Sequence, residues 1–221
     1  EPPQNAPRRV TLRDSRVRQP SWSRAYLAPG YIQSPAGWNA AKGKGKGALP
    51  SDAYALQVLS EILGGGATSP IYRSLVVEQK LAVGAGVGYG PGGLGPAVFS
   101  VYADPRPGVS MKKLEGAMDG EIGRLLKRGL SEKEVSRAKG RLEDSAIYAR
   151  DSLGTGPRVL GEALATGRTA QDVEAWPDRI RAVTTAEVND VFRAVIDKGR
   201  SVTALLLPKG SRGKPVGERP E

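Results

Sequence analysis

The sequence predicts an α+β fold in which one mainly antiparallel sheet carries its helices packed on one face. Segments with the alternating pattern of strands occur before residue 30, between residues 82 and 105, and at residues 201–208. Helical periodicity fills most of the remaining chain. Strands and helices are therefore grouped and do not alternate one by one, and grouping favours a layered α+β fold over a parallel α/β fold.

Two strands are expected near the N-terminus. The segment RRVTLRD (Arg8–Asp14) alternates charged with β-branched or other apolar residues, which predicts an edge strand. In SWSRAYLAP (Ser21–Pro29), alternation places Trp22, Arg24 and Tyr26 on one face. We therefore expect a second strand with one distinct face.

The next region is predicted to form a helix, a tight turn, a second helix and a strand. SDAYALQVLSEILGG (Ser51–Gly65) has a wide apolar stripe and predicts a buried helix, with Gly64 as its left-handed stop. SPIYRSLVVEQKL (Ser69–Leu81) predicts a helix with proline at its first position. AVGAGVGY (Ala82–Tyr89) alternates with glycine, which predicts a strand with one bare face that something can approach closely.

The remaining elements follow from periodicity and capping signals. AVFSVYADP (Ala97–Pro105) is the expected return strand of a hairpin, and a helix with 3/4 apolar spacing should end at Gly129. Later helices are marked by two capping boxes, Ser131 with Glu134 and Thr184 with Glu187. SVTALLLP at residues 201–208 is continuous enough to predict a strand inside the sheet.

Composition excludes several kinds of chemistry. The 221 residues include no cysteine and no histidine. A disulfide framework is therefore impossible, and so are Ser-His-Asp and Cys-His catalysis. Zinc sites are built from Cys, His and carboxylates, so we expect no catalytic zinc and no metal ligand in this chain alone. No apolar run is long enough to predict a membrane span.

The positive charge is concentrated near the N-terminus. The net charge is +10, and the first fifty residues hold nine Lys/Arg against two acids. Such an arm can contact nucleic acid or another anion, but a solvated surface is the simpler interpretation, since stacking aromatics and a nucleic-acid motif are missing. A basic anion-binding or nucleic-acid-binding module is therefore kept as an alternative, and nucleic acid is not the expected partner.

Gly64–Gly66 do not form a phosphate loop. They follow a helix, not a strand, and no Lys-Ser or Lys-Thr closes a Walker motif. Carboxylates that are neighbours in sequence, such as Glu143 and Asp144, do not face one another on a helix, so a paired acid–base site is unsupported.

LSEILGGGATSPIYRSLVVEQKLAVGAGVGY resembles the pitrilysin/insulinase-type (M16) zinc peptidases, in their C-terminal, non-zinc-binding half. Four further stretches fit in the same order. They are SWSRAYLAPGY, VYADPRPGVS, the run from RGLSEKEV to EALATG, and RIRAVTTAEVNDVFRAVI with SVTALLLP. The resemblance covers roughly residues 10–208.

The resemblance implies a division of labour. In this family an N-terminal half carries an inverted His-x-x-Glu-His zinc motif, and its glutamate activates the water. The second half has the same fold without the metal and helps to hold an extended peptide along a strand edge. A chain without histidine matches the second half, so zinc is expected in the partner half and this chain alone is expected to be inactive.

The family also places an arginine and a tyrosine seven residues apart in the second half, where they contact substrate. Aligned without gaps, these positions fall on Val76 and Val83, which are not functional equivalents. The remaining candidate substrate-binding residues are Gly65, Gly66, Arg73 and Tyr89. No catalytic residue is expected.

We therefore expect the non-catalytic second half of a zinc metalloendopeptidase, which forms a chamber wall and a peptide-binding edge opposite a zinc-bearing half in cis or in trans. A non-proteolytic scaffold or assembly subunit is the alternative, and a homodimer is a further partner hypothesis. The expected location is bacterial, periplasmic or membrane-associated outside the cytoplasm, with the cytoplasm as the alternative.

The expected organisation has one domain between two tails. Residues 1–9 are the expected disordered basic N-terminus, residues 10–208 the domain, and residues 209–221 a disordered tail. The Lys-Gly alternation within residues 34–51 predicts a flexible loop inside the domain.

Overall fold

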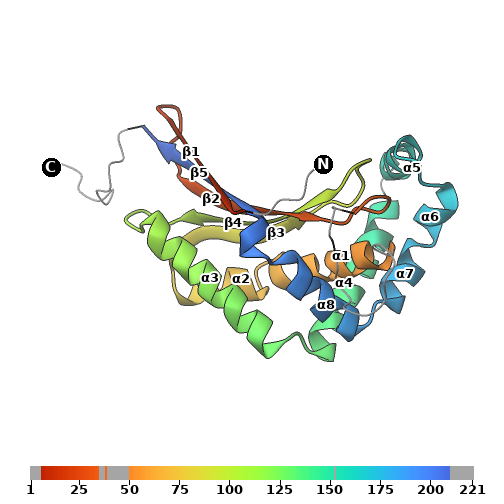
Figure 1. Cartoon of the computed structure of the whole chain (residues 1–221). Helices are drawn as coiled ribbons and strands as arrows, with labels where there is room; N and C mark the ends of the chain where they lie inside the picture. The colour runs from red at the N-terminus through yellow and green to blue at the C-terminus, as the bar shows by residue number, and fades with distance from the viewer. Residues whose placement is uncertain (1–5, 35–37, 39–49, 152, 210–221) are drawn as a thin grey trace.

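The chain folds around one five-stranded sheet (Figure 1). The computed structural model describes residues 6–34, 38, 50–151 and 153–209. The strands are β1 (Arg8–Asp14), β2 (Ser21–Ala28), β3 (Ala82–Tyr89), β4 (Ala97–Pro105) and β5 (Ser201–Pro208). They lie in the order β1-β5-β2-β4-β3. Among the strands that the structure describes, only the β1–β5 pair is parallel, so the sheet is mainly antiparallel as predicted.

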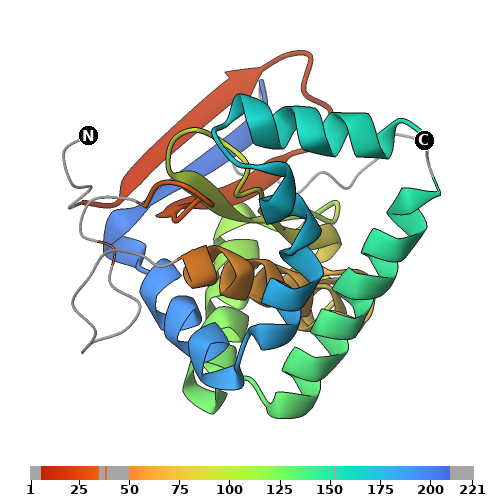
Figure 2. The same ribbon diagram turned by 90° about the vertical axis from the view of Figure 1, so that its right-hand side faces the viewer.

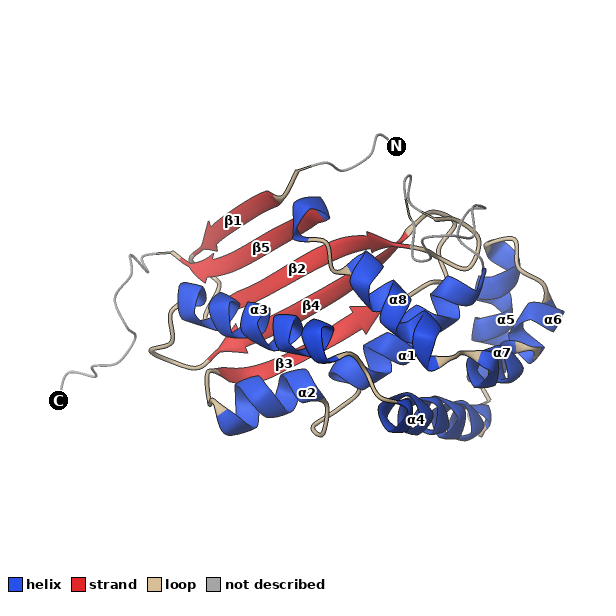
Figure 3. Ribbon diagram, turned by 60° about the horizontal axis from the view of Figure 1, so that its bottom comes forward, coloured by secondary structure: helices blue, strands red, loops and turns tan. Residues whose placement is uncertain are grey.

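The helices form a layer on one face of this sheet (Figure 3). They are α1 (Pro50–Gly64), α2 (Pro70–Tyr72), η1 (Arg73–Glu78), α3 (Met111–Arg128), α4 (Glu132–Arg150), α5 (Thr155–Ala165), α6 (Ala170–Glu174), α7 (Trp176–Ala182), α8 (Thr185–Val195) and η2 (Lys198–Arg200). Of these, α5, α6 and α7 lie beyond one end of the sheet, as Figures 1 and 3 both show, and Figure 2 views the molecule from that end. The predicted α+β class with helices on one face is confirmed.

The alternation in β2 creates the face on which the helices pack. Trp22, Arg24 and Tyr26 are buried, while the residues between them are half-exposed. Arg24 is only 5% exposed, and its guanidinium contacts Glu115 at 2.7 Å and Asp119 at 2.6 Å on α3. A buried cation needs such partners because its desolvation is costly. The ion pairs therefore fix α3 onto the middle of the sheet.

Helix ends follow the predicted capping signals. Ser131 and Glu134 exchange side-chain and backbone hydrogen bonds at the start of α4, and Thr184 and Glu187 do the same at α8. Gly129 ends α3 with φ 75°, a conformation that glycine adopts without strain. Both capping boxes and the glycine stop are confirmed.

The second predicted helix is shorter than its apolar pattern suggests. It starts at Pro70 as α-helix, continues from Arg73 as a wider π-helix, and ends at Glu78. Lys80 then takes a positive φ of 53°, which turns the chain into β3. The apolar residues Ile71, Leu75 and Val76 of α2 and η1 are nevertheless buried, as their spacing in the sequence indicates.

The residues that the structure describes include only part of the segments expected to bound the domain. Strand β1 begins at Arg8, so Arg8 and Arg9 belong to the sheet although the expected domain begins at residue 10. Most of the expected loop 34–51, and most of both expected tails, lies outside the described residues. Within the described part, a helix long and apolar enough to cross a membrane does not occur.

Candidate functional site

The glycine turn after α1 brings that helix directly against β3. A Cβ placed on Gly64 would lie 2.4 Å from the backbone nitrogen of Val87, closer than any side chain allows. The left-handed geometry expected at Gly64 is found instead at Gly66, whose φ is +126°. That detail of the prediction is wrong, because Gly64 is needed for close helix–strand packing and the chain reverses two residues later.

Gly65 has a second steric role. A Cβ at this position would lie 2.4 Å from both the backbone oxygen and a carboxylate oxygen of Glu61. The same carboxylate accepts a hydrogen bond from Arg141 Nε on α4 at 2.5 Å. Gly65 therefore leaves room for an ion pair between α1 and α4, whereas Gly66 is exposed with nothing near its missing side chain.

The bare face of β3 lies beside polar side chains of β4. Gly84, Gly86 and Gly88 pair with Asp104, Tyr102 and Ser100. We call these six residues the β3–β4 strip. The side chains of Ser100, Tyr102 and Asp104 point away from the helices, since they alternate along β4 with the buried residues. The phenol of Tyr102 crosses the strip, because a Cβ on Gly86 would lie 2.6 Å from its Oη.

Arg73 and Tyr89 have separate surroundings. Arg73 is exposed and its Nε donates to Glu78 at 2.7 Å. Tyr89, at the far end of β3, donates its hydroxyl to the Pro29 carbonyl at 2.5 Å and packs its ring against Phe99. Burial raises the pKa of Tyr89 well above its usual range. The structure does not bring these two candidates together.

The positions aligned with the family arginine and tyrosine differ in environment. Val76 is buried against the core, whereas Val83 is half-exposed at a bulge in β3. Arg106, which the sequence analysis did not single out, contacts the backbone at Val76 and at Ala82, the neighbour of Val83. Its Nε donates to the Ala82 carbonyl at 3.2 Å and its Nη2 to the Val76 carbonyl at 3.5 Å. No local motif marks Arg106, since its partners lie 24 and 30 residues away along the chain.

The face of the sheet opposite the helices exposes large apolar side chains. They come from three of the five strands, β1, β4 and β5, and share this face by strand register: Val10, Leu12, Val98, Tyr102, Val202 and Leu206. We call this the open face. Large apolar side chains exposed together on one face are typical of an interaction site.

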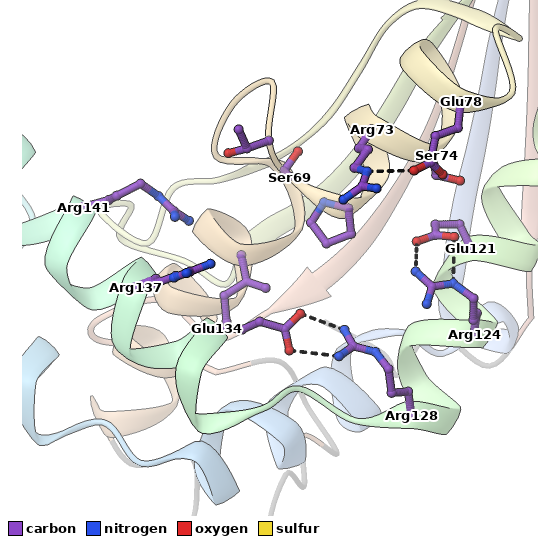
Figure 4. Close-up of a pocket in the computed structure, with 13 residues that line it drawn as sticks. Ser69, Arg73, Ser74, Glu78, Glu121, Arg124, Arg128, Glu134, Arg137 and Arg141 are labelled. Carbon is purple, nitrogen blue, oxygen red and sulfur yellow. Dashed lines mark hydrogen bonds and ion pairs between the residues drawn. The ribbon is translucent and has the colours of Figure 1, made fainter.

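A polar cavity lies on the opposite, helical side of the molecule (Figure 4). Its volume is about 580 Å³, and side chains from the α1–α2 turn, η1, α3 and α4 line it. Arg128 Nη2 contacts Glu134 at 2.7 Å, and this contact, with Ser131, lowers the pKa of Glu134 to about 2. Arg124 Nη2 contacts Glu121 at 2.6 Å. These ion pairs join α3 to α4 and brace α3.

The described residues contain no cluster of three or more histidine, cysteine or acidic side chains arranged to hold a metal ion. The carboxylates around the cavity are engaged by arginines instead.

Comparison with known proteins identifies the family. Residues 1–142 match the model of the peptidase M16 inactive domain, so the chain belongs to this family. A zinc protease of Streptomyces coelicolor that is itself uncharacterized is 27% identical over 152 residues. That match covers 69% of this chain and 33% of the relative. The M16 resemblance predicted from the sequence is confirmed.

Solved structures share the fold. A protease from Helicobacter pylori matches with a TM-score of 0.77 at 19% identity, over 94% of this chain and 45% of that one. A chain of complex III2 from Candida albicans has a TM-score of 0.70 at 16% identity, over 91% and 46%. The periplasmic protease PqqL of Escherichia coli has a TM-score of 0.64 at 15% identity, over 93% and 21%. This chain therefore spans less than half of each of these proteins.

Proposed function

We propose that this chain is the non-catalytic second half of a zinc metalloendopeptidase, and that its open face forms one wall of a substrate chamber. The observation that carries the proposal is the uncovered apolar sheet face in a domain of the M16 inactive family. A sheet normally buries an apolar face against another layer. The zinc-bearing half, in cis or in trans, completes that layer and encloses the peptide.

In this proposal the partner half holds the zinc ion, which activates water for peptide hydrolysis. This chain contributes binding of the peptide substrate. β3 is a sheet edge, so an extended peptide can add to it as a further strand through backbone hydrogen bonds. Tyr102 then offers an aromatic surface over the glycines, and Arg106 holds the start of β3 in position.

The test combines this chain with its zinc-bearing half, recognised by a His-x-x-Glu-His segment in the same reading frame or a neighbouring one. We expect the pair to hydrolyse an unstructured peptide at least tenfold faster than the zinc half alone. Val98→Asp and Val202→Asp place charges on the open face and should lower this activation. Leu153→Asp, at a fully exposed position outside the sheet, is the control. Equal rates with and without this chain would contradict the proposal.

A scaffold role is the second candidate, because one structural neighbour is a chain of complex III2. The same experiment distinguishes the scaffold role from the peptidase role. A scaffold forms a stable complex with its partner, measured by light scattering after gel filtration, without raising peptide hydrolysis. A homodimer of this chain would be detected by the same measurement.

The contacts of the N-terminal arginines argue against the alternative of a basic anion-binding or nucleic-acid-binding module. Arg9 pairs with Glu115, Arg16 with Asp14, and Arg24 is buried between two acids. Binding to nucleic acid that weakens steeply with salt would restore this alternative. We also propose an extracytoplasmic bacterial location, in keeping with the periplasmic neighbour of the same fold.

A further inference from the structure

The cavity on the helical side contains more cations than acids. Five arginines and three glutamates line it: Arg73, Arg124, Arg128, Arg137, Arg141, Glu78, Glu121 and Glu134. Three of the arginines each contact one of the three glutamates, at 2.7, 2.6 and 2.7 Å. Arg141 Nε contacts Glu61, which is not among the lining residues, at 2.5 Å. Among the described residues, Arg137 is the lining cation that is left without an acidic partner.

The two arginines of α4 stand one helical turn apart. Arg137 and Arg141 are related by i and i+4, so they share one face of the helix. Both extend from α4 toward the turn that carries Ser69 (Figure 4). Like charges at this spacing repel one another. Glu61 already offsets the charge of Arg141, so an anion bound beside both guanidinium groups would chiefly give the exposed Arg137 the partner that it lacks.

Ser69 provides an independent observation on the same cavity. The residue is only 6% exposed and lines the cavity, and its hydroxyl oxygen is buried without a hydrogen-bond partner in the described part of the chain. It stands at the N-cap position of α2 but makes no side-chain capping bond. A buried hydroxyl without a partner is costly, and it points to a ligand or a water that the hydroxyl can contact.

We propose that this cavity binds a phosphate group, free or as a small monoester, through Arg137, Arg141 and the Ser69 hydroxyl. Planar guanidinium groups present paired N–H donors that match phosphate oxygens, and a hydroxyl adds one further donor. A volume of about 580 Å³ accommodates a small molecule. The site lies on the helical side, away from the open face, so it does not depend on the proposed peptidase role.

The test titrates inorganic phosphate into the full chain at low ionic strength and follows binding by isothermal calorimetry and phosphorus NMR. We expect saturable binding of one phosphate per chain. Arg137→Ala should weaken binding by about tenfold or more, since it removes a charge-assisted contact. Ser69→Ala should weaken binding severalfold without lowering the melting temperature of the free chain, because it removes a buried hydroxyl that caps nothing.

Lys133→Ala is the matched control. Lys133 is also on α4, is exposed, and does not line the cavity, so its removal changes the net charge equally without touching the site. Non-saturable binding, or equal weakening by Lys133→Ala and Arg137→Ala, would show general charge attraction and overturn the proposal. Absence of detectable phosphate binding in this titration would mean that water alone fills the cavity, and it would also overturn the proposal.

A parallel titration with phenyl phosphate distinguishes the two possible ligands, free phosphate and a small phosphate monoester. Binding as tight as that of inorganic phosphate supports a phosphorylated small molecule as the ligand. Binding at least tenfold weaker supports the free ion. Either result leaves the peptidase proposal unaffected, because the titration needs neither the zinc half nor a peptide.

Discussion

The two faces of the sheet differ in almost every respect. On the covered face, Trp22, Phe99 and Val101 are buried under α1, α3 and α8, and the buried cation there, Arg24, has two acidic partners. On the open face, Val98 and Tyr102 from the same strand β4 remain exposed, beside the glycines of β3. The covered face therefore stabilises this chain by itself, whereas the open face gains its burial only when something else covers it.

The largest expected effect separates neighbouring residues of β4. Phe99→Ala should cost about 3–5 kcal/mol of unfolding free energy, because Phe99 is fully buried and its removal leaves a cavity. Val98→Ala, on the open face at 47% exposure, should cost less than about 1 kcal/mol in the isolated chain. Urea unfolding followed by circular dichroism measures both. Similar costs would mean that the open face is already covered in solution.

Removal of the buried cation tests the polar anchor of the covered face. Arg24→Ala should cost about 1.5–3 kcal/mol, because Glu115 and Asp119 each lose one charge-assisted contact, while Arg9 and Lys198 still pair with them. Arg16→Ala is the control, since it breaks an exposed, solvent-screened pair with Asp14 and should leave the stability nearly unchanged. A small effect of Arg24→Ala would show that α3 is held mainly by apolar packing.

Two glycine substitutions with opposite expected signs test the helix–strand contact. Gly64→Ala should destabilise the chain by about 1–3 kcal/mol, because its Cβ would collide with the backbone of β3. Gly123→Ala, within α3 and with nothing near its missing side chain, should stabilise by about 0.5–1 kcal/mol. Thermal unfolding of the two variants shows whether each substitution raises or lowers the stability of the chain. Stabilisation by Gly64→Ala would disprove the close approach of α1 to β3.

The smallest expected effect concerns pH. The pKa of Glu134 is lowered to about 2 by Arg128 and Ser131, from an ordinary value near 4.5. Because the folded pKa is depressed, the contribution is present above about pH 4.5 and is lost as the pH falls toward 2. Glu134→Gln should therefore cost about 1 kcal/mol at pH 7 and almost nothing near pH 2. A cost that does not vary with pH would assign the effect to capping geometry alone.

Several features were predictable because they depend on short-range rules. The buried face of β2, both capping boxes and the stop at Gly129 follow from residues at most four positions apart. The π-helical geometry of η1 and its end at Glu78 were not predictable, because the apolar spacing also suits an ordinary α-helix up to Leu81. The candidates Gly65, Gly66, Arg73 and Tyr89 could be named from sequence, but their surroundings could not.

The sequence by itself determined the family, the α+β class and the absence of histidine and cysteine chemistry, because composition, periodicity and motif order are properties of the chain. Only the tertiary structure decided that Gly64 serves packing on β3, that Tyr102 lies over Gly86, and that Arg137 and Ser69 line one cavity. Those contacts join residues 16 to 68 positions apart, and the way in which elements pack on one sheet brings them together.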